Sequence, residues 1–321
     1  MSNVLVTGAG GAAGVAVIRA LRASGGMRVV AADSDPHAAG LELANNAVVL
    51  PNATSQRFVP MLLQTCRHFS VDAIVCTVAE EMPFIGDASE ALQTSGTSVW
   101  LPPGPAVSIC NDKQRFAALL RNNGVATPAT CTGIDTLVPG PWIIKPRNGR
   151  GSRDVFAAET IDDVTYALRR VPDPIIQTRI DGREFTVDVL VERGGEIAAL
   201  SPRWRLATKG GISTSGVTFQ HPAVTQLVHD TMRTLSYEGI ACLQGFLDDS
   251  GAATCIEVNP RFGGGVSLSI AAGADFATEF VRATLGSRVR SNRLQATVGV
   301  RMSRYFDEVF SMNEPAGQKC A

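Results

Sequence analysis

The feature that most constrains this 321-residue chain is a glycine-rich turn between a strand and a helix near its start. An apolar segment at residues 3–7 precedes four glycines within residues 8–14, and apolar residues at helical spacing follow. A second apolar segment then ends at Asp33. This order predicts a βαβ unit with parallel strands, so the chain begins with an α/β sheet.

The same turn leaves two functions open. Gly8, Gly10 and Ala13 with an acid at Asp33 have the layout of a dinucleotide-binding fingerprint, in which amides at a helix start hold a pyrophosphate. Glycines at these positions also let a helix pack closely on a strand without binding any ligand. A nicotinamide-dependent oxidoreductase is therefore one hypothesis for the chain.

A further apolar strand at residues 72–77 is followed by Glu80 and Glu81. Acids beyond the carboxyl end of a strand lie where open α/β sheets bind ligands. Carboxylates are also favourable in the first turn of a helix, which is the alternative interpretation. The proline-rich residues 101–105 resemble a linker, so we expect the first domain to end near residue 110.

Composition argues against several classes of protein. Lys and Arg total 29 and Asp and Glu total 30, so no excess of positive charge attracts nucleic acid. The 7 cysteines contain no C-x-x-C pair, which favours a reduced cytoplasmic protein over a disulfide framework or a zinc ribbon. The apolar first residues have no basic region before them, which argues against a signal peptide. No stretch approaches the ~20 apolar residues of a membrane span.

The middle of the chain carries cations beside glycines. Asn111 is expected to cap a helix over residues 112–123, and Lys145 ends an apolar strand. The basic, glycine-containing residues 147–153 follow, as expected of a loop that closes over phosphates, although an ordinary basic turn fits too. Three further cations precede a second glycine pair and indicate either an anionic ligand or a solvated loop. They are Arg203, Arg205 and Lys209.

Two apolar segments near the C-terminal end predict an antiparallel hairpin with a polar face. Glu257 and Asn259 are two residues apart and therefore share a face, and Gln244 lies on the partner strand. A carboxylate and amide oxygens are hard ligands that suit Mg²⁺ held jointly with phosphates. Arg261 follows on the same face, and glycines 263–265 leave room for a ligand to approach the backbone.

Together these segments resemble the ATP-grasp superfamily, and specifically one half of the carbamoyl-phosphate synthetase large subunit. The resemblance extends over nearly the whole chain, and it rests on the order and separation of its motifs. It implies an N-terminal Rossmann-like parallel α/β domain (1–110), followed by an ATP-grasp module of two α+β subdomains (111–178 and 179–321). It also implies that the first domain carries no NAD and helps to build the acceptor side of the cleft.

The resemblance implies a role for each candidate residue. Lys113 and Lys145 correspond to the cations that hold the ATP phosphates, and Gly149, Arg150, Gly151 and Ser152 to the mobile loop above them. The segment Gln177, Arg179 and Ile180 corresponds to the linker that reads adenine, and Glu184 to the acid that binds ribose. Gln244, Glu257 and Asn259 correspond to the magnesium ligands, with Mn²⁺ as an alternative ion. Arg261, Arg203 and Lys209 correspond to catalytic cations, and Glu80, Glu81, Arg205 and Gly264 to substrate contacts.

The implied reaction is ATP-dependent formation of an amide or peptide bond between a small carboxylate and an amine, through an acyl phosphate. A shielded γ-phosphoryl group is required before a carboxylate can attack it, which explains the cations and the metal ligands. One departure is the neutral Gln244, where many relatives carry an acid. The oxidoreductase and a non-catalytic ATP-binding module remain the alternatives, and a homodimer remains open.

Overall fold

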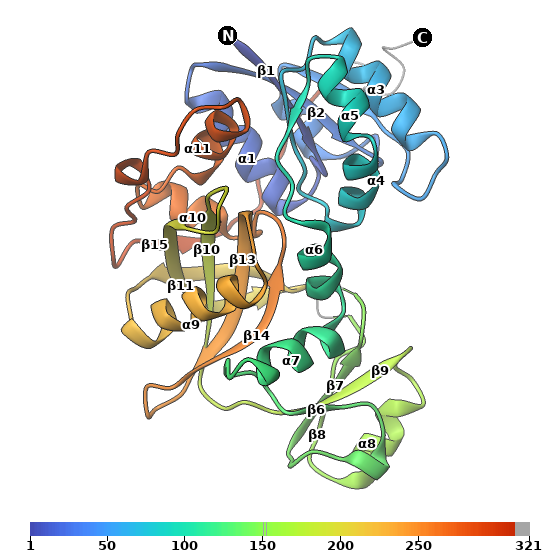
Figure 1. The fold of residues 1–321 in the computed structure, drawn as a ribbon, viewed down its shortest axis with the longest axis vertical. Coiled ribbons are helices and arrows are strands. Elements are labelled where there is room, and N and C mark those ends of the chain that lie inside the picture. Colours follow the sequence, from blue (N-terminus) through green and yellow to red (C-terminus); the bar gives the residue numbers. More distant parts are fainter. Residues whose placement is uncertain (150, 152, 312–321) are drawn as a thin grey trace.

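The computed structural model describes residues 1–149, 151 and 153–311, and within these residues the strands form three sheets (Figure 1). A parallel sheet comes from the first third of the chain, a small antiparallel sheet from the middle, and a larger antiparallel sheet from the rest. This mixture confirms the predicted fold class, a parallel α/β unit followed by two α+β units.

The N-terminal sheet has the strand order β3-β2-β1-β4-β5, and the strands are parallel. Order reverses between β1 and β4, which creates the crevice where such sheets bind ligands. The strands are β1 (Ser2–Thr7), β2 (Met27–Asp33), β3 (Asn46–Val49), β4 (Ala73–Val75) and β5 (Ser98–Val99). The helices of this unit are α1 (Ala12–Ala23), α2 (Ala39–Leu43), α3 (Phe58–His68), α4 (Met82–Asp87) and α5 (Ser89–Thr94).

The glycine turn is shaped by packing. Gly8 has a φ of +64°, and a Cβ atom on Gly14 would come within 2.2 Å of the Gly8 carbonyl oxygen. A side chain at Gly14 would therefore push α1 away from the turn after β1, and one at Gly8 would be strained and would meet Val78 and Thr77. The turn explains how the helix lies so close to the buried strand.

The small sheet follows a pair of helices and has the order β6-β9-β7-β8. Thr160 caps its helix α8 reciprocally with Asp163. The elements are α6 (Gly104–Asn111), α7 (Lys113–Asn122), β6 (Thr130–Cys131), β7 (Trp142–Pro146), β8 (Phe156–Ala158), α8 (Ile161–Leu168) and β9 (Pro174–Thr178). The prediction that Asn111 caps the following helix is wrong: it ends α6, and the Asp112 carboxylate accepts the cap bonds of α7.

The large sheet has the order β14-β13-β10-β11-β12-β15, and the pairs are antiparallel. Alternate residues of β10 point to opposite faces: Phe185, Val187 and Val189 enter a core with helix α9, and the polar residues between them face the other way. The elements are β10 (Arg183–Val191), β11 (Ile197–Lys209), β12 (Ile212–Thr218), α9 (Pro222–Thr234), β13 (Gly239–Leu247), β14 (Ala253–Asn259) and β15 (Arg301–Ser303).

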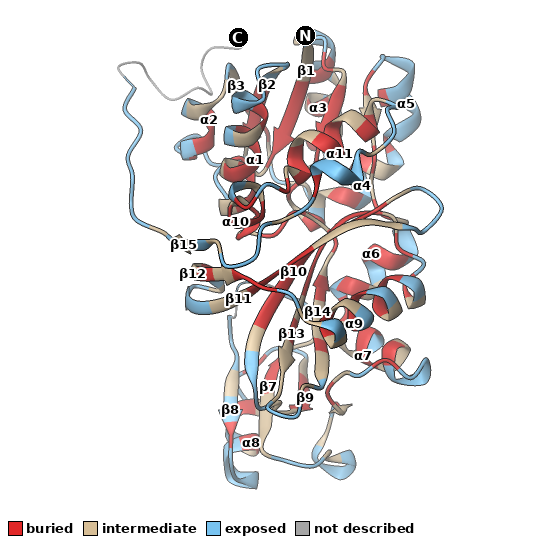
Figure 2. Cartoon of the chain, turned by 90° about the vertical axis from the view of Figure 1, so that its left-hand side faces the viewer, coloured by how far each residue is buried: buried red, intermediate tan, exposed pale blue. Residues whose placement is uncertain are grey.

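Two helices from late in the chain, α10 (Val266–Ala271) and α11 (Phe276–Thr284), pack on the N-terminal unit beside α1 (Figure 1). Phe276 and Phe280 share a core with Val4 and Val6, and the Phe280 ring stacks on Trp100 at 5.1 Å. Figure 2 shows that the central strands are mainly buried, whereas the segment after β15 is exposed. The N-terminal unit and the segment that carries α10 and α11 therefore share one hydrophobic core.

Short 3₁₀ turns complete the described elements, at residues Ala79–Glu81, Ile134–Thr136 and Ser291–Arg293. Within the described residues, none of the helices combines the length and the apolar character that crossing a membrane requires.

Candidate functional site

The polar face of the large sheet gathers side chains from four adjacent strands. Strand register places Gln244 opposite Glu257 on one side and opposite Thr186 on the other, and Thr186 pairs in turn with Arg203. Directly opposed residues project from the same face, so these four side chains form one row across the sheet. The predicted pairing of Gln244 with the Glu257 strand is present.

Hydrogen bonds connect this face into a continuous chain. The Gln244 amide donates to Glu257 Oε1 at 2.7 Å, and the Asn259 amide donates to the same oxygen at 3.1 Å. Arg261 donates to Asn259 Oδ1 at 3.1 Å, and Arg205 donates to Gln244 Oε1 at 2.6 Å. Both amides thus donate to one carboxylate, Glu257, and each amide oxygen accepts a hydrogen bond from an arginine.

The charge of Glu257 also acts on two lysines that come from outside the large sheet, Lys113 at the start of α7 and Lys145 on β7. Lys145 is only 8% exposed at the end of β7. Burial lowers the pKa of Lys145 to about 8, while the nearby Glu257 carboxylate acts in the opposite direction and the charge of Lys113 lowers it further. Burial also lowers the pKa of Lys113, again opposed by Glu257. A buried lysine and a partly buried one, both under the influence of one acid, suit an anion with several charges.

Asp112 supports the end of α7 that carries Lys113. Its carboxylate accepts hydrogen bonds from the Gln114 and Arg115 amides and so caps α7. The Arg147 guanidinium donates two further bonds to it, at 2.9 and 2.5 Å. Asp112 therefore links the start of α7, which carries Lys113, to the segment after β7. The predictions omitted both Asp112 and Arg147 as supporting residues, because their pairing depends on the tertiary fold.

The predicted phosphate loop lies partly outside the described residues, which include neither Arg150 nor Ser152. Gly149 and Gly151 have φ values of +133° and +73°, so the backbone requires glycine there. The Lys113 ammonium donates to the Gly149 carbonyl at 2.9 Å. The β11–β12 turn lies against this loop, because a Cβ on Gly211 would come 3.0 Å from Gly151 Cα.

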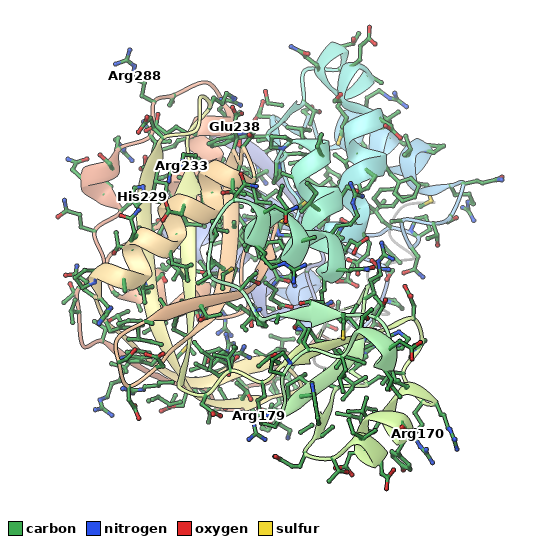
Figure 3. The ribbon with its side chains drawn as sticks, turned by 60° about the horizontal axis from the view of Figure 1, so that its bottom comes forward. Arg170, Arg179, His229, Arg233, Glu238 and Arg288 are labelled. Carbon is green, nitrogen blue, oxygen red and sulfur yellow. The ribbon has the colours of Figure 1, made fainter. Side chains whose placement is uncertain are left out.

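The predicted adenine segment lies at the end of β9. The Gln177 side chain is buried and donates to the Thr130 hydroxyl at 2.9 Å, and its backbone pairs with Thr130 on one side and Ile143 on the other. Arg179 pairs with Glu159 and extends outward from the small sheet (Figure 3), and Ile180 follows it with intermediate burial. The structure therefore does not bring the Arg179 side chain to Glu257.

The predicted ribose acid, Glu184, lies on β10 and accepts a hydrogen bond from Arg205 at 2.5 Å. Burial raises the pKa of Glu184, and the Arg205 guanidinium opposes that shift. Arg205 also donates to the Gly211 carbonyl at 2.9 Å. Arg205 thus joins Glu184, Gln244 and the β11–β12 turn.

Arg203 and Lys209 differ from the prediction. Arg203 is 2% exposed and forms a buried ion pair with Asp188 at 3.0 Å, so its charge on the polar face is neutralised and is not presented to an open cleft. Lys209 is exposed, and its ammonium lies 5.3 Å from the centre of the Phe306 ring. Gly264 lies beside the start of α1, since its Cβ would come 3.5 Å from that of Ala12.

Glu80 and Glu81 lie in the 3₁₀ turn after β4, at the carboxyl edge of the N-terminal sheet. Burial raises the pKa of Glu81 to about 7, although contacts with Thr7 and the Cys76 thiol act in the opposite direction. The thiol donates to the Glu81 carboxylate at a sulfur–oxygen distance of 3.7 Å. These acids thus come from a different sheet than the Glu257 row.

The glycine turn already uses its amides internally. The Gly10 amide donates to Asp33 Oδ2 at 2.7 Å, and the amides of Ala9 and Gly11 donate to the carbonyls of Ala32 and Gly8, each at 3.1 Å. A pyrophosphate would have to compete for these donors. The geometry therefore opposes the dinucleotide hypothesis. His229 extends to the surface from α9 and lies outside this site (Figure 3).

Comparisons with known proteins agree with this architecture. The family described as "ATP-grasp in the biosynthetic pathway with Ter operon" matches residues 170–306, and the family "PylC-like, N-terminal domain" matches residues 4–100. A carbamoyl-phosphate synthase of Methanobrevibacter smithii is 25% identical over 206 residues, which cover 61% of this chain and 53% of that protein. A D-alanine–D-alanine ligase of Fusobacterium nucleatum is 29% identical over 85 residues, covering 26% of this chain and 30% of the ligase.

The crystal structure of an L-amino acid ligase from Bacillus licheniformis has the same fold, with a TM-score of 0.71 and 21% identity. That match covers 89% of this chain and 74% of the ligase. The matches to the two curated relatives span about half or less of each relative's length. The family matches, the shared fold and the row of side chains around Glu257 agree: residues 170–306 of this chain belong to an ATP-grasp family, and the chain is similar to about half of a carbamoyl-phosphate synthase.

Proposed function

We propose that the chain is an ATP-dependent carboxylate–amine ligase that forms an amide or peptide bond. The single observation that carries the proposal is the row of oriented polar side chains around Glu257, whose charge also acts on Lys113 and Lys145. This arrangement suits a magnesium-bound triphosphate. The two lysines would neutralise phosphate oxygens, and the carboxylate and amide oxygens would hold the metal.

The donor set fits Mg²⁺ shared with phosphates. Within the described residues, no three His, Cys, Asp or Glu side chains gather to hold a metal by themselves. Glu257 and Asn259, with Gln244 beside them, would supply a few oxygens, and the nucleotide would supply others. When bound, Mg²⁺ would neutralise charge on the phosphates. Mn²⁺ would suit the same oxygens.

The reaction follows from this placement. A substrate carboxylate attacks the γ-phosphorus, the bond to the β-phosphate oxygen breaks, and ADP leaves. Arg261, held by Asn259, would stabilise the transferred phosphoryl group. An amine then attacks the acyl carbon, gives up a proton and displaces phosphate. Loop residues 149–152 would exclude water during these steps.

The remaining predicted roles form part of this proposal. The backbone of residues 177–180 would contact adenine, and Glu184 would contact ribose. Glu80 and Glu81 would hold the amine substrate, with Arg205 and Gly264 near the carboxylate and Lys209 on the turn above. An amino acid is the substrate class we propose, since the fold is shared with an L-amino acid ligase.

We also propose domain limits at residues 110 and 178, supported by the ranges of the three sheets. A reducing, cytoplasmic location is proposed because the six described cysteines are buried free thiols. The partners we propose are small molecules. A homodimer is a further possibility that sedimentation can test.

Thermal unfolding with ligands tests the nucleotide assignment. A ligand that binds only the native state raises its melting temperature, so the non-hydrolysable analogue AMP-PNP with Mg²⁺ should stabilise the chain and NAD(P) should not. Measuring ADP release in the presence of pairs of amino acids then distinguishes a ligase from a non-catalytic ATP-binding module. Stabilisation by NAD(P) alone would reject the proposal, and so would an ADP release that no carboxylate and amine pair stimulates.

A further inference from the structure

Arg203 is enclosed by partners that fix its orientation. Its Nε and Nη2 atoms each donate to a different oxygen of Asp188 at 3.0 Å. Its Nη1 atom donates to the Thr186 hydroxyl at 2.6 Å. Both Arg203 and Asp188 are at most 2% exposed. A two-point guanidinium–carboxylate pair of this kind holds the guanidinium plane in one position.

The backbone of the glycine loop after Arg261 rests directly on that plane. A Cβ on Gly265 would come 2.3 Å from Arg203 Nη1, and one on Gly263 would come 3.0 Å from Nη2. Gly265 has a φ of −100°, which any residue can adopt. Space above the guanidinium, and not backbone conformation, therefore requires glycine at position 265.

Asp188 extends the contact to the next helix. The hydroxyl of the fully buried Ser269 on α10 donates to Asp188 Oδ2 at 2.7 Å. Helix α10 begins where the glycine loop ends and contacts α1 of the N-terminal unit. At the other end of the loop, Arg261 donates to the Phe262 carbonyl at 2.9 Å. The Arg203–Asp188 ion pair thus supports the glycine loop and α10, and through the loop it supports Arg261.

We propose that Arg203 is a positioning residue: with Asp188 it fixes the loop Phe262–Gly265, and thereby holds Arg261 and the wall between the large sheet and α1. It does not contact substrate. The inference rests on the proposed ligase function. Because the lysines and Glu257 belong to other elements, a disturbed loop should impair transfer to the acceptor and leave nucleotide binding intact.

The test uses Gly265→Ala, Arg203→Lys and the double variant, with Gly26→Ala as the matched control because its Cβ would meet no atom within 4 Å. AMP-PNP affinity with Mg²⁺ should stay within about threefold of wild type in all four, and ADP release with amino acids should fall by about tenfold or more in the first three. The double variant should be no worse than Arg203→Lys alone, because both changes act on one contact. Hydrogen exchange should rise at residues 262–272 and remain unchanged at residues 113–147.

The outcomes separate the two levels of the proposal. A wild-type chain that does not bind AMP-PNP overturns the ligase proposal together with this inference. A wild-type chain that binds and turns over overturns the positioning role alone if Gly265→Ala retains its turnover or the two single losses multiply. Equal losses of AMP-PNP affinity and of turnover in the loop variants would also overturn it.

Discussion

Gln244 donates a hydrogen bond of 2.7 Å to Glu257 across two adjacent strands, and the same glutamine accepts one of 2.6 Å from Arg205. Both ends of the amide are thus engaged, which fixes its orientation. Glu257 is the carboxylate on which the amides of Gln244 and Asn259 and the charges of both lysines converge. It is therefore the residue whose removal should affect catalysis most.

Glu257→Gln should reduce ADP release by about a hundredfold or more, because the amide cannot supply the negative charge that holds a divalent ion. The side chain keeps its size, so the melting temperature without ligand should change little. Glu90→Gln, an exposed change on α5, is the control. Near-normal turnover in Glu257→Gln would refute the metal assignment.

The buried Lys145 should lower the stability of the folded chain and raise its affinity for nucleotide. Its folded-state pKa of about 8 lies below the value near 10.4 of an exposed lysine, so the unfolded chain binds more protons between these values. Stability should therefore rise with pH over that window and be lowest below pH 8. Lys145→Met should raise the melting temperature at pH 7 and remove this rise, while AMP-PNP affinity falls by about tenfold or more. A lower melting temperature at pH 7 would contradict the assignment of a costly buried charge.

Asp112→Ala should destabilise the chain by about 1–2 kcal/mol through loss of the α7 cap. Although burial opposes it, hydrogen bonds from Arg147 and the backbone lower the pKa of Asp112, so its contribution is present at neutral pH and is lost as pH falls through that lowered pKa. The affinity for AMP-PNP should fall as well, because Lys113 loses its support. Asp112→Asn, which keeps a capping oxygen, should recover most of the stability in urea unfolding but only part of the affinity.

Glu81 should make the stability of the folded chain fall as pH rises, which is opposite to the effect of Lys145. Burial raises its pKa to about 7, so between about 4.5 and 7 the folded chain holds a proton that the unfolded chain has lost. This contribution is full below pH 4.5 and is lost as pH rises through 7. The melting temperature of Glu81→Gln, relative to wild type, should therefore increase across this window. A constant difference would show that Glu81 titrates normally.

The sequence by itself determined the classes of element and the order of the motifs. The period of two in β10 and β14 specified which side chains share a face, since strand geometry fixes that alternation locally. The glycine turn and the βαβ unit followed from the apolar pattern in the same way. Asp188 lies two and four residues after Thr186 and Glu184, so the same alternation could have placed it on the polar face.

Only the tertiary structure decided how distant segments meet. The sequence presents both Arg203 and Lys145 as cations close to glycines, yet Arg203 is neutralised by Asp188 beneath a glycine loop and Lys145 is buried near the charge of Lys113. The residue that caps α7 is Asp112 and not the predicted Asn111, and its carboxylate also pairs with Arg147. The physical reason is that burial and partner charge depend on packing between elements far apart in the chain, which local sequence does not encode.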